Sequence, residues 1–163
     1  MTLIREGRAE DEKSPIMNIS FTSTRKFAQP ASVIFDELIN WQGHAIWVPM
    51  TRVKIITGDG GAGTEFVATT GLGPISLTDR MRVDELDRQA MRVRITKIGP
   101  VLTGVVEMQV VATGRANAYI TWREDIRVPI IPQFLGRPTA AVAQRAFLIS
   151  LNRLAKMLPP SSI

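Results

Sequence analysis

Residues 138–158 read PTAAVAQRAFLISLNRLAKML, and this stretch decides the fold because it has the pattern of one long amphipathic helix. At about 100° per residue, the bulky side chains of Phe147, Leu151, Leu154 and Leu158 fall on a single face. A proline suits the first helical turn, and two prolines directly after the stretch end it. We therefore predict a helix over residues 138–158 that closes the domain.

The apolar face of this helix is small in its first half. Ala140 and Ala143 lie on the same stripe as the leucines, but one to two turns earlier. Because this helix has bulky core side chains at one end and only alanines at the other, we predict a cavity beside the alanines. Gln144 lies next to this half of the face, and we predict that its amide is a polar contact in the cavity.

The rest of the chain supplies a sheet for this helix. Residues 18–28 alternate apolar and polar side chains and predict a strand. A helical spacing begins at Pro30, and the aromatic-rich segment 40–49 follows it. Six further stretches have strand patterns and are separated by short gaps rich in turn residues, namely residues 52–57, 64–72, 75–86, 90–97, 103–112 and 116–128.

Consecutive strands with short connections pair antiparallel, since parallel neighbours need long crossovers. One apolar face needs a cover, and a strongly twisted sheet curls around the single long helix. We predict an α+β domain with a seven-stranded curved antiparallel sheet wrapped around the C-terminal helix, and two short helices after the first strand. This domain is expected over residues 16–158, with a flexible arm over residues 1–15 and a tail over residues 159–163.

Composition narrows the class of protein further. Of 163 residues, 45% are hydrophobic, and no apolar run approaches the roughly 20 residues that cross a bilayer. The first fourteen residues are charged and lack the apolar core of a secretory signal, so a cytoplasmic location is expected. With no cysteine and one histidine, we expect neither a disulfide nor a metal site, and no cofactor.

The net charge of +5 comes mainly from arginines scattered along the predicted strands. Nucleic-acid binding is not expected, because no helix-turn-helix, zinc-finger or ribonucleoprotein signature occurs. If the hairpin around residues 87–89 pairs Arg82 with Arg92 and Arg80 with Arg94, four like charges stand together outside the sheet, and acidic neighbours such as Asp84 are expected nearby. A solvated face is one reading, and transient contact with an anionic membrane surface or an acidic partner is the other.

Four motifs occur in a fixed order: PASVIF at residues 30–35, WQGHAIWVP at 41–49, GDGGAGT at 58–64 and ITWRE at 120–124. With this set, residues 18–158 resemble the START-related superfamily, also called SRPBCC, which includes birch-pollen-allergen-like proteins and the polyketide cyclase/dehydrase and lipid-transport families. The resemblance implies a helix-grip fold and a lipid, polyketide, isoprenoid or quinone as ligand. It does not choose among enzymes, carriers and binding modules.

The glycine-rich segment at residues 58–64, which we call the glycine loop, matches the dinucleotide-binding fingerprint in its glycine spacing alone. Gly58, Gly60 and Gly63 have the required spacing, but the residues that follow have a strand pattern, whereas pyrophosphate binding needs a helix N-terminus. We predict a tight hairpin with positive φ angles. In the resembling allergens the corresponding loop sits at one end of the cavity, so a gating role stays open.

Two carboxylates fall on the apolar faces of predicted strands. Asp79 lies on the same strand face as Leu77 and Met81, and Glu124 lies on the same face as Trp122. A carboxylate on an inward face is paired, protonated or turned toward a wet cavity, because burying it bare is costly. Each is therefore a general acid/base or ligand contact, or half of a structural ion pair with an arginine, or turned outward by a bulge.

His44 lies between two tryptophans, Trp41 and Trp47. The imidazole would serve as a proton shuttle at a cavity mouth or simply as a packing side chain. The tryptophans would form the lid of an apolar pocket or plug one end of the sheet.

The sequence predicts binding, with transport as one use, of an apolar or amphipathic small molecule between the sheet and the last helix. Two alternatives stay open: a cyclase/dehydrase-type enzyme with Asp79, Glu124 or His44 moving protons, and an interaction module using the four arginines. The oligomeric state is not predicted. The expected ligand-binding residues are Trp41, His44, Trp47, Asp79, Met81, Val93, Met108, Trp122, Glu124, Gln144 and Phe147.

Overall fold

The computed structural model describes residues 17–128 and 136–159. The arm predicted over residues 1–15 and all of the predicted tail beyond Pro159 lie outside these residues. Within the described part, no helix is long and apolar enough to cross a membrane.

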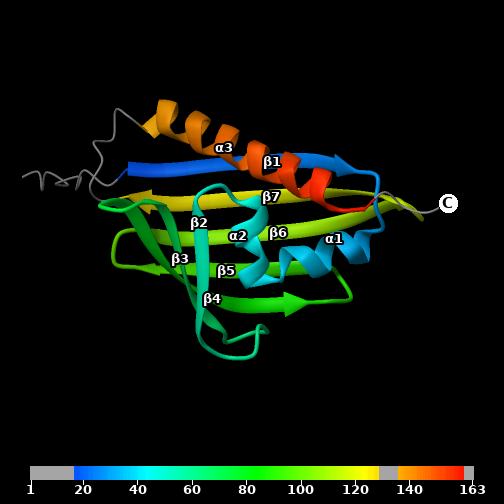
Figure 1. Ribbon diagram of the computed structural model, residues 1–163, viewed down its shortest axis with the longest axis horizontal. Helices are drawn as coiled ribbons and strands as arrows, with labels where there is room; N and C mark the ends of the chain where they lie inside the picture. Colours follow the sequence, from blue (N-terminus) through cyan, green and yellow to red (C-terminus); the bar gives the residue numbers. More distant parts are fainter. Residues whose placement is uncertain (1–16, 129–135, 160–163) are drawn as a thin grey trace, which may run out of the picture.

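Seven antiparallel strands form one curved sheet in the order β1-β7-β6-β5-β4-β3-β2, as Figure 1 shows. Its alternation of apolar and polar residues places every second side chain inward, most regularly along β7. The predicted architecture is confirmed, and the strand ends differ from the prediction by two residues or fewer. The strands are β1 (Met17–Phe27), β2 (Thr51–Thr57), β3 (Glu65–Leu72), β4 (Ile75–Asp87), β5 (Arg92–Gly99), β6 (Thr103–Gly114) and β7 (Asn117–Val128).

Short helices connect β1 to β2. Helix α1 (Ala31–Leu38) buries Ile34, Phe35 and Leu38 and packs on β6 and β7, so it plugs one end of the curved sheet. A 3-10 turn, η1 (Trp41–Gly43), leads into α2 (His44–Trp47), which contacts β2 and α3.

The long helix α3 (Gly136–Met157) packs on β1 and runs along the inner side of the sheet, as Figure 1 shows. Its burial is uneven. Leu151 and Leu154 are fully buried and Leu158 just after the helix is nearly so, whereas the alanines of its earlier turns are only partly covered or exposed. The helix is therefore anchored to the core by its last turns.

The glycine loop is a hairpin turn, as predicted. Gly58, Gly60 and Gly63 all have positive φ angles, and β3 begins directly after Thr64, so no helix follows the loop. The loop has a structural use, because the carbonyl of Gly60 accepts a hydrogen bond from the indole Nε1 of Trp41 at 2.8 Å.

Gly104 in β6 occupies a position that a larger residue does not fit. Its φ is +141°, and a Cβ built there would lie 2.1 Å from the carbonyl oxygen of Asp125 on β7. In the sheet register Gly104 lies between Lys97 on β5 and Ile126 on β7. Strand β6 therefore adds no side chain to the row that holds Lys97.

We expect Gly104→Ala to lower the free energy of unfolding by about 3 kcal/mol, because it combines a strained backbone with a backbone clash. Gly114→Ala in the same strand is the matched control, since its Cβ would meet only the side chain of Asn117, at ordinary contact distances of 3.7 and 4.0 Å. Urea unfolding of both variants measures the difference. Equal losses in the two variants would contradict the close approach of β6 and β7.

Candidate functional site

A cavity of about 470 Å³ lies between the sheet and α3. This volume is in the range of small-molecule pockets, roughly 300 to 1,000 Å³. Most of its lining is apolar and comes from nearly every element of the fold. Representative wall residues are Phe21 of β1, Phe66 of β3, Met81 of β4, Ile95 of β5, Val106 of β6 and Phe147 of α3.

The alanines of α3 help to create this space. Ala143 and Ala146 line the cavity and contribute no bulk, while Phe147 packs against Trp122 with ring centroids 4.1 Å apart. The void that the sequence predicts beside the small half of the helix is therefore present, although it lies beside Ala143 and Ala146 and not beside Ala140.

Gln144 does not provide the predicted polar contact in the cavity. Its Nε2 donates a hydrogen bond to the carbonyl oxygen of Thr22 at 2.8 Å, and the residue is not part of the cavity wall. The side chain lies on the edge of α3 that packs on β1, so it fastens the helix to the sheet.

The structure brings most of the predicted ligand-binding residues together. Trp47, Val93 and Met108 are fully buried in the core and are not part of the wall. Val93 and Met108 lie opposite each other in neighbouring strands, β5 and β6. The predicted residues that line the cavity are Trp41, His44, Asp79, Met81, Trp122, Glu124 and Phe147.

Three charged side chains project from the strands into this apolar wall. Asp79 of β4, Lys97 of β5 and Glu124 of β7 are each less than 10% exposed. The ammonium of Lys97 donates a hydrogen bond to Asp79 Oδ2 within a buried ion pair. Glu124 Oε1 accepts a hydrogen bond from the indole Nε1 of Trp122 at 2.9 Å. We call Asp79, Lys97 and Glu124 the charged trio.

Burial and charge act against each other in the charged trio. Burial lowers the pKa of Lys97, but the charges of Glu124 and Asp79 and the hydrogen bond to Asp79 outweigh it, so this pKa lies above its ordinary value. Burial raises the pKa of Asp79 more than the lysine lowers it. Lys97 is therefore an ammonium at neutral pH and serves as a donor and a positive charge, not as a nucleophile.

The sequence interpretation missed Lys97, although the alternation of β5 contains the signal. Val93, Ile95 and Lys97 share parity, and all three are buried. The expected partner of Asp79 was an arginine. A lysine takes this place because its flexible stem lies along the apolar wall while its head reaches the carboxylate.

His44 is buried beneath the aromatic rings next to the cavity. Its Nε2 lies 2.8 Å from the carbonyl oxygen of Leu38, which can only accept, so Nε2 carries the proton and Nδ1 has the free lone pair. Burial lowers the pKa of His44 to about 4, against a smaller opposite effect of the bond to Leu38. The ring is neutral at physiological pH and packs between Trp41 and Trp47, with centroids 5.6 and 4.6 Å away.

The rim of the cavity is apolar. Met50, Leu77 and Ile149 line the cavity and are 40 to 61% exposed, so they mark its opening to solvent. The charged trio lines the same cavity, but each of its members is less than 10% exposed. The rim that these three exposed residues form is therefore apolar.

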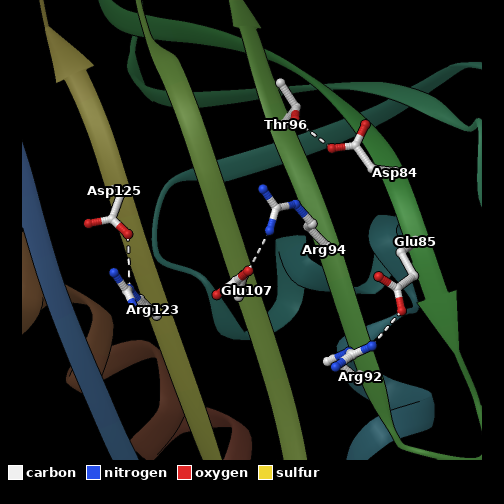
Figure 2. Close-up of polar contacts among 8 residues, drawn as sticks. All are labelled: Asp84, Glu85, Arg92, Arg94, Thr96, Glu107, Arg123 and Asp125. Carbon is white, nitrogen blue, oxygen red and sulfur yellow. Dashed lines mark hydrogen bonds and ion pairs between the residues drawn. The ribbon is translucent and has the colours of Figure 1, made fainter.

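The outer face of the sheet does not hold the predicted arginine cluster. Arg92 lies opposite Asp87 and Arg94 opposite Glu85. The turn covers residues 88–91, further along the chain than predicted, and Asp87 accepts a hydrogen bond from Ala90 N within it. Each arginine faces a carboxylate, and Figure 2 shows two of these pairs on the side of the sheet away from the helices. The pairs are Arg80–Glu65 at 2.5 Å, Arg82–Asp84 at 2.9 Å, Arg92–Glu85 at 2.7 Å and Arg94–Glu107 at 2.7 Å.

The expected acidic neighbour Asp84 is present beside Arg82, but the concentrated positive charge is not. Contact with an anionic membrane or an acidic protein through this face therefore stays a prediction without a charged cluster to support it. No group of three or more histidine, aspartate or glutamate side chains that could hold a metal ion occurs within the described part of the chain.

Comparison with known proteins agrees with this architecture. The sequence model for polyketide cyclase / dehydrase and lipid transport proteins matches residues 18–158. No curated protein is detectably similar to the chain in sequence.

Several solved structures share the fold. The Zhui aromatase/cyclase from Streptomyces sp. R1128 superposes with a TM-score of 0.72 at 17% identity, covering 85% of this chain and 92% of that one. A START superfamily protein from Mycobacterium smegmatis gives 0.71 at 13% identity, covering 84% and 94%. Norcoclaurine synthase from Thalictrum flavum, in complex with dopamine and hydroxybenzaldehyde, gives 0.62 at 20% identity, covering 98% and 99%. At these identities the likeness shows the fold alone.

The only histidine makes one prediction directly measurable. Between pH 6.5 and pH 4 the unfolded chain binds a proton that buried His44 does not, so stability is complete above pH 6.5 and is lost as the pH falls toward 4. The loss from this group is about 3 kcal/mol. We expect the NMR signal of the His44 ring to titrate near pH 4, and His44→Gln, which keeps a donor for Leu38, to remove this part of the pH dependence. Titration between pH 6 and 7 would show that the ring is not buried as described.

The charged trio makes a second prediction. Lys97→Met leaves two carboxylates in the wall without a cation, and we expect a loss of about 3 to 5 kcal/mol in the free energy of unfolding. Lys97→Met combined with Asp79→Leu should recover at least half of it. Arg94→Met, which breaks an exposed pair with Glu107, is the control and should cost less than about 1 kcal/mol. Similar losses for Lys97→Met and Arg94→Met in urea unfolding at pH 7 would refute the buried pairing.

Proposed function

The chain belongs to the polyketide cyclase / dehydrase and lipid transport family, and from this premise we propose that it binds an apolar or amphipathic small molecule in the cavity between the sheet and α3. Family membership supports a ligand-binding or cyclase-type role in this fold. Lipids, polyketides, isoprenoids and quinones are the ligand classes to consider. The observation that carries the proposal is the apolar cavity of about 470 Å³ beside Ala143 and Ala146.

Burial of the ligand's hydrocarbon would supply the binding energy. Apolar surface removed from water contributes about 25 cal/mol per Å², before the cost of ordering the ligand. Trp41, Met81, Trp122 and Phe147 offer large side chains for this contact. The exposed rim residues would ease the entry of an apolar molecule from a membrane, a carrier or an enzyme.

The second candidate function is a cyclase/dehydrase-type reaction in the same cavity. It is favoured by a specific observation: two carboxylates flank a charged lysine in an otherwise apolar wall. The ammonium of Lys97 would polarise a substrate carbonyl, and Glu124 or Asp79 would remove a proton from the adjacent carbon. That carbon would attack a second carbonyl of the same chain, and the protonated carboxyl group would return its proton to the new alkoxide. Neutral His44 is a further candidate base through Nδ1.

The two candidates are separated by turnover. Purified protein incubated with a poly-ketone chain would form a cyclised product if it is an enzyme, and Glu124→Gln would abolish turnover while the protein stays folded. A molecule that is extracted with the purified protein and stays unchanged after incubation would favour binding or transport.

A substitution that fills the cavity tests the binding proposal. Ala143→Phe would displace about two methylene groups of a bound ligand, each worth about 0.8 kcal/mol, so the dissociation constant should rise about tenfold. The probe is N-phenyl-1-naphthylamine, an uncharged fluorophore that brightens in apolar surroundings. Val142→Phe is the matched control, because Val142 is the preceding residue and is 69% exposed. Failure of the probe to bind the wild-type protein, or equal affinities for both variants, would refute the proposal.

A further inference from the structure

The charged trio has hydrogen-bonding capacity that the protein does not use. A lysine ammonium has three N–H donors. Lys97 gives one to Asp79 Oδ2 and makes a weak contact of 3.8 Å with the sulfur of Met81, and its third donor has no acceptor within the described residues. Glu124 uses Oε1 for the indole of Trp122, while its Oε2 accepts no hydrogen bond from any described residue. Both side chains line the cavity.

The unused groups of Lys97 and Glu124 face a shared space. Lys97 and Glu124 line the same cavity, and no ion pair or hydrogen bond joins them. The negative charge of Glu124 also raises the pKa of Lys97. In the register, Lys97 lies opposite Gly104 of β6, which lies opposite Ile126 of β7, and Glu124 is two residues before Ile126 on the same buried face of β7. Gly104 has no side chain to cover Lys97 from β6. A small polar group placed between the ammonium and the carboxylate would meet a donor on one side and an acceptor on the other.

The charge of the charged trio decides which polar group fits. With both carboxyl groups ionised the charged trio carries a net charge of −1, and it is buried, where a further anion would be repelled strongly. A carboxylate or phosphate head group is therefore disfavoured. An ammonium head group has no acceptor for Lys97, and an ether or a ketone has no donor for Glu124. A hydroxyl group both accepts and donates.

We propose that the ligand of this cavity has an uncharged hydroxyl end, an alcohol or a phenol, which accepts a hydrogen bond from Lys97 Nζ and donates one to Glu124 Oε2. This rests on the proposed ligand-binding function and adds the chemical class. The apolar remainder of the ligand lies against the aromatic residues and the alanines of α3. Fatty acids and phospholipids are excluded as preferred ligands, although their chains would suit the cavity walls.

Four ten-carbon compounds test this class while the chain length stays constant. The compounds are 1-decanol, decyl methyl ether, decanoate and decylamine, each competing with bound N-phenyl-1-naphthylamine at pH 7. We expect 1-decanol to bind about tenfold more tightly than the ether, since one charge-assisted hydrogen bond is lost, and at least tenfold more tightly than decanoate or decylamine. Decanoate or decylamine binding as tightly as 1-decanol would overturn the proposal, as would equal affinities for alcohol and ether.

Glu124→Gln isolates the residue, because glutamine can still accept the bond from Trp122. In this variant we expect the preference for 1-decanol over decanoate to fall to about threefold or less. Glu107→Gln removes a carboxylate from the outer face and should leave the preference unchanged. An unaltered preference in Glu124→Gln would refute the assignment. If neither the probe nor any of the four compounds binds, the proposed function itself fails; if all bind alike, only the hydroxyl assignment fails.

Discussion

The cavity depends on how α3 is fixed to the sheet. Leu151 and Leu154 of α3 and Leu158 just after it bury their side chains completely or nearly so, and this removal of apolar surface from water holds the helix on the sheet. The earlier turns carry Ala143 and Ala146, which reach the wall but cannot fill the space in front of it. Since the strands curve around the helix, anchoring at one end leaves a hollow toward the other.

The charged trio lowers the stability of the fold, and a role in ligand binding or chemistry explains why it is present. Removing three charged groups from water costs more than their mutual attraction returns unless their hydrogen bonds are complete. Here they are incomplete, since Asp79 Oδ1 is buried without a partner and Lys97 has an unused donor. An apolar set of side chains would pack this wall more favourably. A site kept at the expense of stability is expected where binding or chemistry needs it.

Much of the fold was predictable, because strands and helices carry periodic patterns. The alternation along β7 and the leucine stripe of α3 each specify which face is buried, and turn residues specify where strands end. The alternation of a strand tells which face of the sheet a side chain lies on, but it does not tell whether that position lies beside the cavity. Val93 and Met108 share the inward face with the cavity residues, yet they lie in the closed core.

The site was less predictable than the fold. The two inward carboxylates followed from alternation, but Lys97 was overlooked, although the same rule applied to β5 places it inward. The contact of Gln144 with Thr22 depends on how α3 sits on β1, which no helical pattern specifies. The arginine pairing depended on where the turn between β4 and β5 falls, because moving the turn along the chain changes every cross-strand neighbour.

The central claim is that hydrocarbon occupies the hollow between α3 and the sheet. Isotope-filtered NOE spectroscopy on methyl-labelled protein with unlabelled 1-decanol tests it most directly. The account predicts NOEs from the alkyl chain to the methyl groups of Ala68, Met81 and Ala143, which line the cavity, and none to Val142 on the outer side of the helix. NOEs to Val142 in place of the three lining methyl groups would contradict it.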